Sequence, residues 1–222
     1  KTFSYPEIND EHLQTKIFRK REFYYHRVPP RNKLNTYEEI ENYRNAICSG
    51  ELRLREQQMI LSNLISPYTP YNGLVVMHGT GTGKTCGSIS VAEQFKEQVK
   101  KYNTKIFVLV PGPNNRETWR SELLTCTGET YLKKKYLLSQ MNKNEINREK
   151  KIAQYAALQY YKIMSYKTFY KKVLGEKIRE HKIVGDNKIK TSYRKTVDGE
   201  FEREIVVDRI TNMDNTLLII DE

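Results

Sequence analysis

The chain has 222 residues, of which 38% are hydrophobic, and its formal net charge is +11. This length suits one domain with an appendage. No run of about 18 apolar residues is present, which excludes a membrane-spanning helix. The three scattered cysteines show no metal-binding spacing and predict buried free thiols in a reducing, intracellular compartment.

Residues 1–51 contain no catalytic motif and are predicted to form a mainly helical extension. A capping box at Thr36-Tyr-Glu-Glu39 opens a helix that should end at Gly50. Basic and aromatic residues are interleaved between positions 17 and 27, and two interpretations stay open for them. They could stack on bases and bind phosphates, or their rings could dock the extension on the main domain, which is the commoner arrangement.

An apolar run at Gly73–Met77 leads directly into the sequence His-Gly-Thr-Gly-Thr-Gly-Lys-Thr at 78–85. We expect a strand followed by a phosphate-binding loop, because the glycines at 79, 81 and 83 can adopt positive φ and turn N–H groups inward. Lys84 would add a charge for the β- and γ-phosphates, and Thr85 a hydroxyl for Mg²⁺. A helix with its apolar face at 89, 92, 95 and 99 should begin here and point its positive dipole end at the same anion.

One residue departs from the pattern G-x-x-x-x-G-K-[ST], because His78 stands where that pattern has glycine. A larger residue is tolerable at the exit of a strand if its side chain points away from the phosphates. The alternative is a Gly/Thr-rich turn with an incidental lysine. That alternative requires strand, glycines, Lys-Thr and helix to coincide by chance.

Three further apolar runs, at 105–111, 162–166 and 217–220, predict strands separated by helical stretches. Together with the run before His78 they indicate an α/β fold, a doubly wound parallel sheet with ligands at the carboxyl ends of its strands. The last run ends in Asp221-Glu222, which alone is often a plain strand end. Paired with the glycine-rich loop, it predicts that Asp221 holds a metal and Glu222 orients the attacking water.

Positive charge is concentrated near the end of the chain, since residues 131–222 carry +7 and the segments 1–72 and 73–130 carry +2 each. The basic runs there could follow nucleic-acid phosphates or form solvated surface, and both interpretations stay open. These runs are 133–135, 150–151, 171–172 and 188–195.

Residues 175–212 are predicted to be an inserted β-hairpin, in which 188–197 pairs with 200–207 around Asp198-Gly199. This register places Lys195 opposite Glu202 and Arg194 opposite Arg203.

The order of these motifs resembles that of superfamily 2 helicases and translocases. Residues 78–85, 108–122, 163–166 and 217–222 resemble motifs I, Ia, Ib and II, and Leu54–Gln58 resembles the family's adenine-reading segment, with Gln58 as its glutamine. The resemblance covers residues 52–222 and is greatest to helicases of large cytoplasmic DNA viruses. Among these, the small subunit of the poxvirus early transcription factor is similar and also has a histidine at the place of His78.

This resemblance implies that residues 52–222 are the first RecA-like, ATP-binding lobe of an ATP-dependent helicase or translocase that uses Mg²⁺. Enzymes of this superfamily also need a second RecA-like lobe that supplies an arginine finger, so we expect a longer protein. The ATP-binding residues it implies are Gln58, Gly79, Thr80, Gly81, Thr82, Gly83, Lys84 and Thr85; the metal ligands are Thr85 and Asp221, and the catalytic residues are Lys84, Asp221 and Glu222. The nucleic-acid contacts it implies are Pro111, Asn114, Asn115, Arg116, Tyr166 and Lys167.

The resemblance further implies partners and a location. The partners are the DNA backbone and a viral RNA polymerase or another transcription-factor subunit, with a role in early transcription and no membrane. The location is the virion and the cytoplasmic viral factory of the host cell. Two alternatives stay open: a nucleotide-binding structural subunit of a virion or viral transcription complex, and a P-loop kinase of small molecules.

Overall fold

The computed structural model describes residues 5–28, 30, 33–48, 54–79, 81–128, 130–132, 141–174, 176–178, 180–184, 188–192, 203–205 and 209–221. Its helices are α1 (Leu13–Phe18), α2 (Arg21–Tyr24), α3 (Tyr37–Cys48), α4 (Glu56–Leu64), α5 (Lys84–Gln94), α6 (Lys96–Lys101), α7 (Pro113–Cys126), α8 (Lys143–Leu158) and α9 (Tyr166–Leu174). Its strands are β1 (Ile106–Val110), β2 (Tyr161–Ser165), β3 (Glu176–Ile178), β4 (Glu180–Val184), β5 (Lys188–Ser192), β6 (Arg203–Ile205) and β7 (Leu217–Ile220).

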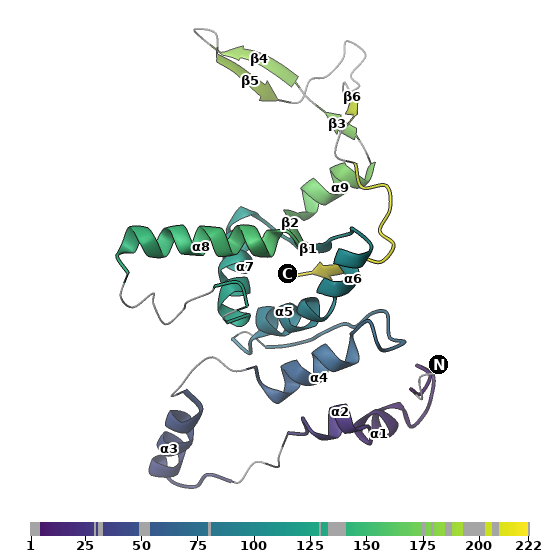
Figure 1. Ribbon diagram of the computed structural model, residues 1–222, viewed down its shortest axis with the longest axis vertical. Helices are drawn as coiled ribbons and strands as arrows, with labels where there is room; N and C mark the ends of the chain where they lie inside the picture. The colour runs from purple at the N-terminus through teal and green to yellow at the C-terminus, as the bar shows by residue number, and fades with distance from the viewer. Residues whose placement is uncertain are drawn as a thin grey trace.

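The centre of the fold is a parallel sheet in the order β2-β1-β7, with helices between the strands in sequence (Figure 1). Three of the predicted strands, near 106, 162 and 217, are therefore confirmed. All five residues of β1 are buried, as expected for the middle strand of a sheet that is covered on both faces.

Alternate residues of β1 enter two different cores. Ile106, Val108 and Val110 pack with the buried faces of α5, α6, α7 and α8, which include Trp119 and Leu123. Phe107 and Leu109 pack on the opposite face, where Phe169 of α9 and the segment around Met213 lie. The doubly wound α/β arrangement is confirmed, although the described sheet has three strands.

The predicted strand at Gly73–Met77 is not formed. This segment is unpaired, and Val75 and Met77 are 87% and 90% exposed. In the described part of the chain β7 is the edge of the sheet, and nothing pairs with the segment. An apolar run without a neighbouring ladder has no hydrogen bonds to keep it as a strand.

The N-terminal extension docks on the main domain through a few contacts. Phe23 of α2 is fully buried, Asn63 of α4 donates to the Glu22 carbonyl at 2.8 Å, and the Tyr71 hydroxyl donates to the Pro6 carbonyl at 2.9 Å. This confirms the docking interpretation for part of the 17–27 segment, whereas Tyr25 is 81% exposed. The capping box at 36–39 is also confirmed by its two side-chain bonds.

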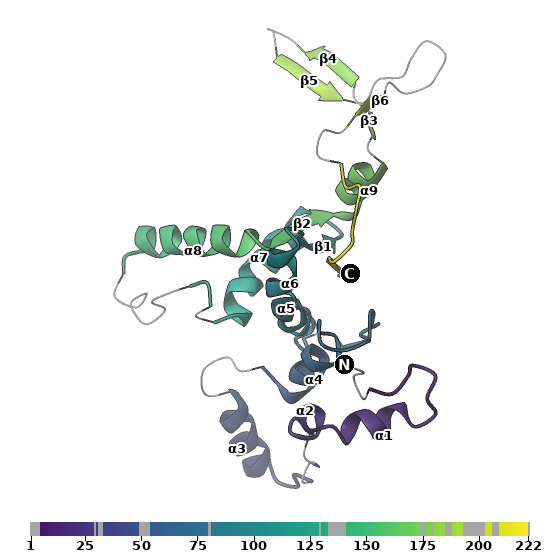
Figure 2. The same ribbon diagram turned by 45° about the vertical axis from the view of Figure 1, so that its right-hand side comes forward.

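The predicted hairpin within residues 175–212 is wrong in its pairing. Strand β5 pairs with β4, and β6 pairs with β3, both antiparallel, so Arg203 lies opposite Ile178. Strand β4 precedes β5 in the sequence and contains the β-branched residues Ile183 and Val184. It therefore competes with residues 200–207 for pairing with β5. Arg194, Lys195 and Glu202 lie outside the described residues. Figures 1 and 2 show both pairs beyond α9, away from the central sheet.

No helix in the described part of the chain is long and apolar enough to cross a membrane.

Candidate nucleotide-binding site

The three parallel strands end side by side. Val110 of β1 is in register with Ser165 of β2, and Leu109 is in register with Ile220 of β7. The residues that follow these strands therefore reach one edge of the sheet, which is the usual place for ligands in such folds. Pro111, Tyr166 and Asp221 are brought together in this way.

The glycine-rich loop lies beside this edge and leads into α5. Gly81 and Gly83 have φ of 76° and 81°, in the left-handed region that favours glycine. The prediction of positive φ is wrong for Gly79, whose carbonyl accepts a hydrogen bond of 2.7 Å from the Thr82 hydroxyl. Thr80 lies outside the described residues.

Lys84 and Thr85 open α5, an 11-residue helix whose N-cap is Gly83. Orphan N–H groups and the positive end of the helix dipole therefore face the loop. The predicted apolar face is confirmed in α5 by the buried Ile89 and Ala92, whereas the buried Val99 belongs to the separate helix α6, so the prediction of one helix through residue 99 is wrong. Helix α5 ends at Gln94, and α6 begins after Phe95 as a separate short helix (Figure 1).

A cavity of about 760 Å³ lies between α5, the 72–78 segment and β7. Lys84 and Asp221 both line it, so the predicted phosphate lysine and the predicted metal ligand face the same space. His78 lines it too, and within the described structure its buried Nδ1 atom has no hydrogen-bond partner. A polar atom in this state can be satisfied by a polar ligand.

Gln58 contacts the glycine-rich loop directly. It lies buried in α4, where its Nε2 atom donates to the Gly83 carbonyl at 2.9 Å and its Oε1 atom accepts from the Arg55 N–H at 2.9 Å. A Cβ atom at Gly83 would lie 2.7 Å from Gln58 Nε2. The structure thus joins Gln58 to the loop, while its role in reading adenine stays a prediction.

Asp221 is held by its main chain from two sides. Its N–H donates to the Leu109 carbonyl at 2.9 Å, and its carbonyl accepts from the Tyr166 hydroxyl at 2.5 Å. Glu222 lies outside the described residues, so its role in orienting water stays a prediction.

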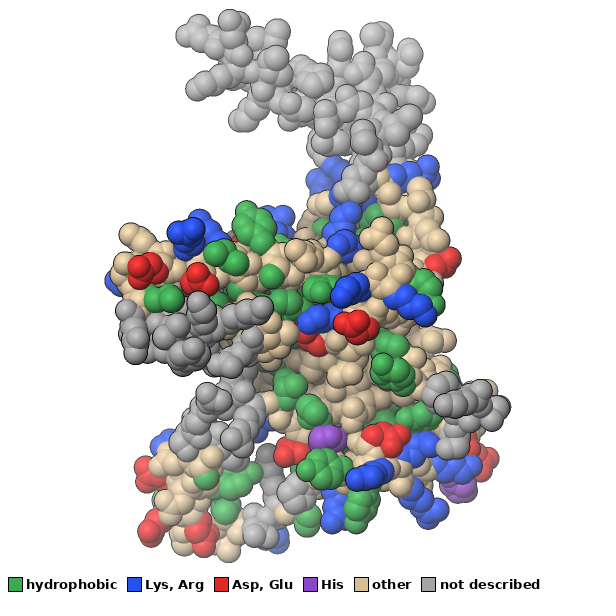
Figure 3. Space-filling view, in the orientation of Figure 1, with side chains coloured by type: hydrophobic (Ala, Val, Ile, Leu, Met, Phe, Trp, Pro, Cys, Tyr) green, Lys and Arg blue, Asp and Glu red, His purple; other side chains and the backbone are tan. Residues whose placement is uncertain are grey.

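The predicted nucleic-acid contacts occupy the same edge. Pro111, Asn114 and Asn115 are exposed at the start of α7, whereas Arg116 is half-buried and its Nε atom lies 3.8 Å from Glu117 Oε1. Tyr166 and Lys167 begin α9 and are exposed. Figure 3 shows basic side chains gathered over α9, which carries Lys171 and Lys172 in its last turn.

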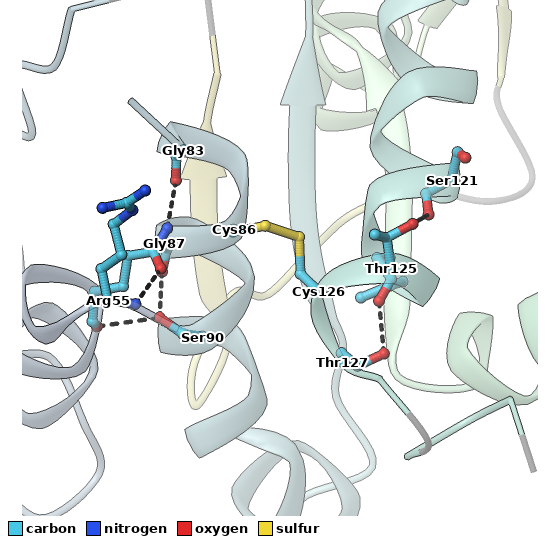
Figure 4. The surroundings of a disulfide bond; sticks show 11 residues. Arg55, Gly83, Cys86, Gly87, Ser90, Ser121, Thr125, Cys126 and Thr127 are labelled. Carbon is cyan, nitrogen blue, oxygen red and sulfur yellow. Dashed lines mark hydrogen bonds between the residues drawn. A yellow bond between two sulfur atoms is a disulfide. The ribbon is translucent and has the colours of Figure 1, made fainter. Parts of the chain in front are cut away.

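A disulfide joins Cys86 and Cys126, so the prediction of free thiols is wrong for these two cysteines and stays untested for Cys48. The two Cα atoms are 5.4 Å apart, and the bond links the first turn of α5 to the end of α7 (Figure 4). Their separation of 40 residues gave no signal, because packing of α5 beside α7 is what brings them together. Tyr166 as a partner of Asp221 was also missed, since no sequence pattern encodes that contact.

The residues present fit a nucleoside triphosphate with Mg²⁺. Gly83 stands where a side chain would meet Gln58, Lys84 offers a cation to the cavity, and Asp221 lines the same cavity with the kind of oxygen ligand that Mg²⁺ prefers. Thr85 follows Lys84 in the first turn of α5 and is half-buried, but it is not among the residues that line the cavity, so its role as a metal ligand stays a prediction. A phosphate-binding loop before a helix, beside an acidic strand end in a parallel sheet, defines a P-loop nucleotide-binding domain.

Comparison with known proteins narrows this class to one family. Residues 50–222 match the family described as "Type III restriction enzyme, res subunit". The chain belongs to this family of helicase domains.

Its relatives are proteins of large DNA viruses. It is 52% identical, over 99% of its length, to a candidate ATP-dependent RNA helicase of Acanthamoeba polyphaga mimivirus, and 29% identical to a second one from that virus. It is 34% identical over half its length to a candidate helicase of Invertebrate iridescent virus 3. The chain spans 19% and 30% of the two mimivirus proteins. No solved structure gave a significant match.

Proposed function

We propose that the chain provides the first ATP-binding lobe of a nucleic-acid helicase or translocase, which hydrolyses MgATP. The observation that carries this proposal is the cavity shared by Lys84 and Asp221 at the carboxyl edge of the sheet. The family match supports a helicase over a small-molecule kinase. The names of the two mimivirus relatives mention RNA, whereas the sequence resemblance implied DNA. Both DNA and RNA therefore belong in the test.

In this proposal different residues bind the phosphates, hold the metal and position the attacking water. The N–H groups of the loop and the Lys84 ammonium bind the β- and γ-phosphates and stabilise the charge that develops on the transferred group. Mg²⁺, when bound, would neutralise further charge between these phosphates. Thr85 and Asp221 are the residues that would hold it, and Glu222 orients the attacking water.

Coupling to nucleic acid follows from the position of the exposed residues. The start of α7 and the start of α9 lie at the same edge as the nucleotide cavity. A strand held there by its phosphates would respond to opening and closing of this lobe against a second RecA-like lobe of the same protein. The proposal also includes a role in early transcription, with a viral RNA polymerase or another transcription-factor subunit as the partner. It places the protein in the virion and in the cytoplasmic viral factory of the host cell.

The test compares two variants of the full-length protein. Lys84→Ala should abolish ATP hydrolysis while the protein still melts cooperatively, because only the phosphate charge is removed. Glu222→Gln should keep ATP binding but hydrolyse it at least about 100-fold more slowly, as expected for loss of a water-positioning residue. Wild-type hydrolysis by both variants would overturn the proposal.

A structural nucleotide site is the second candidate. The Asp221-Glu222 pair argues against it, because a site that only binds does not need the second acid. ATP binding by the full-length protein without turnover, with DNA or RNA strands added, would favour this candidate.

A further inference from the structure

Asp221 depends on a residue that is distant in sequence. The Tyr166 hydroxyl donates a hydrogen bond of 2.5 Å to the Asp221 carbonyl, across 55 positions of the chain. Tyr166 follows β2 directly and is the first residue of α9. It is 37% exposed, so its ring lies at the surface while its hydroxyl reaches the site.

The sheet order explains why a long side chain is needed. In the described sheet β1 lies between β2 and β7, so Tyr166 reaches across one whole strand. Two strand spacings amount to roughly 9–10 Å. A tyrosine can span much of this distance, and its hydroxyl then ends at the main chain of the strand end that carries the metal-binding carboxylate.

Two main-chain hydrogen bonds hold the end of this strand. β7 has four residues and is the edge of the described sheet, where it pairs with β1 alone. The peptide of Asp221 is fixed by β1 through the Leu109 carbonyl and by α9 through the Tyr166 hydroxyl. A shift of the start of α9 would therefore move or release the Asp221 carbonyl.

We propose that Tyr166 is a positioning residue that couples the exposed start of α9 to the Asp221 carboxylate. A nucleic-acid strand that touches Tyr166 and Lys167 would fix this hydroxyl, and with it the position of Asp221, the residue that would hold the metal. The inference rests on the proposed function, because it assigns a regulator to the same site. It makes ATP turnover and metal affinity sensitive to one hydroxyl outside the nucleotide cavity.

The test uses Tyr166→Phe in the full-length protein, with Tyr170→Phe as the matched control. Tyr170 is one turn further along α9 and 63% exposed. Steady-state ATP hydrolysis is measured with and without single-stranded DNA or RNA, together with ATP binding and the Mg²⁺ concentration that gives half-maximal rate. The thermal midpoint of each variant is recorded, and assays run well below it.

Tyr166→Phe should leave ATP binding within about twofold, because the loop and Lys84 are untouched. The Mg²⁺ concentration for half-maximal rate should rise severalfold. The nucleic-acid-stimulated kcat should fall on the order of tenfold, as for loss of one hydrogen bond in the transition state. Tyr170→Phe should match the wild type in all three quantities.

Three outcomes separate this inference from the proposed function. If the wild type hydrolyses ATP in a Lys84-dependent way and Tyr166→Phe has wild-type metal dependence and stimulation, the inference is overturned and the function stands. If only the thermal midpoint falls, Tyr166 is structural and the inference is again overturned. If the wild type shows no Lys84-dependent hydrolysis, the proposed function itself fails.

Discussion

At the scale of single residues, the shape of the phosphate-binding loop depends on Gly83. This residue has positive φ, is the N-cap of α5, and its carbonyl accepts a hydrogen bond from Gln58. Its neighbours leave no room for a methyl group. One glycine thus holds together the loop, the helix and the buried glutamine.

Gly83→Ala should weaken ATP binding by at least tenfold, because left-handed backbone costs a non-glycine residue about 1–2 kcal/mol and the new Cβ displaces Gln58. Gly112→Ala is the matched control, since Gly112 has extended backbone, a Cβ there meets nothing within 4 Å, and it is not among the residues that line the cavity. Fluorescence titration with a nucleotide analogue measures both. Equal binding by the two variants would show that the loop adapts without Gly83.

A second residue-scale feature is the carboxylate of Glu93, which accepts hydrogen bonds from Tyr161 at 2.5 Å and Tyr131 at 2.9 Å. Burial, and then the nearby Glu93 charge, raise the pKa of both tyrosines above its usual value near 10. The folded protein therefore resists their ionisation. Their contribution to stability is complete below pH 10 and is lost as pH rises towards their folded pKa.

Tyr161→Phe tests this arrangement by urea unfolding between pH 7 and pH 11. At pH 7 the variant should lose about 1–2 kcal/mol of unfolding free energy, because Glu93 loses a buried donor. Above pH 10 its stability should fall less steeply than that of the wild type. Parallel curves for the two proteins would show that Tyr161 does not ionise on unfolding in this range.

At the scale of elements, the disulfide between α5 and α7 is the main surprise. Disulfides persist in oxidising environments, which include virion surfaces, and not in a reducing cytosol. The bond is therefore at odds with the reducing compartment that the cysteine count suggested. Figure 4 shows that it fastens the first turn of α5, next to the phosphate-binding loop, to the end of α7.

Cys126→Ser should lower the unfolding free energy by about 4 kcal/mol, the chain-entropy value for closing a loop of this length. The corresponding loss in thermal midpoint is about 10 °C. Scanning calorimetry with and without reductant measures it, and Cys48→Ser serves as control. If reductant destabilises Cys126→Ser as strongly as the wild type, the bond is not the source of the effect.

The sequence predicted those elements whose pattern has a direct physical cause. The apolar runs of β1, β2 and β7, the capping box at 36–39 and the buried stripe of α5 were all confirmed. Strand pairing was harder to predict from the sequence, because it depends on which segments become neighbours in the folded chain. For that reason the 73–77 segment and the partner of β5 were predicted wrongly.

The same distinction holds for the site. Gly83, Lys84 and Asp221 could be named from motifs because phosphate and metal chemistry restrict those positions to few residue types. The Gln58 contact to Gly83 and the Tyr166 contact to Asp221 could not, because each joins side chain to main chain across distant segments. Such contacts follow from packing, which short motifs do not encode.

At the scale of the whole molecule, positive charge is the feature of this chain that can attract nucleic acid. The excess of +7 lies in residues 131–222, and α9 presents basic side chains near the site (Figure 3). Binding of this kind depends on phosphates and is nearly indifferent to sequence.

Replacing the basic run at 133–135 by alanine tests which cations meet the strand. This run lies outside the described residues. If it contacts single-stranded nucleic acid, the slope of log K against log salt for the full-length protein should flatten by about 2, at roughly 0.7 per phosphate. An unchanged slope would assign the run to solvent. Strong preference for one sequence over a scrambled one would point to a promoter-reading factor.

The order in which the chain is made also has a consequence for β7. This strand is synthesised about 100 residues after its partner β1, and Asn215 beside it is held by Thr104 across 111 positions. At typical ribosomal speeds the interval is on the order of 5–20 s. During this interval the edge of β1 that β7 later covers is open to water and to other nascent chains. The yield of native protein therefore depends on what shields that edge during translation.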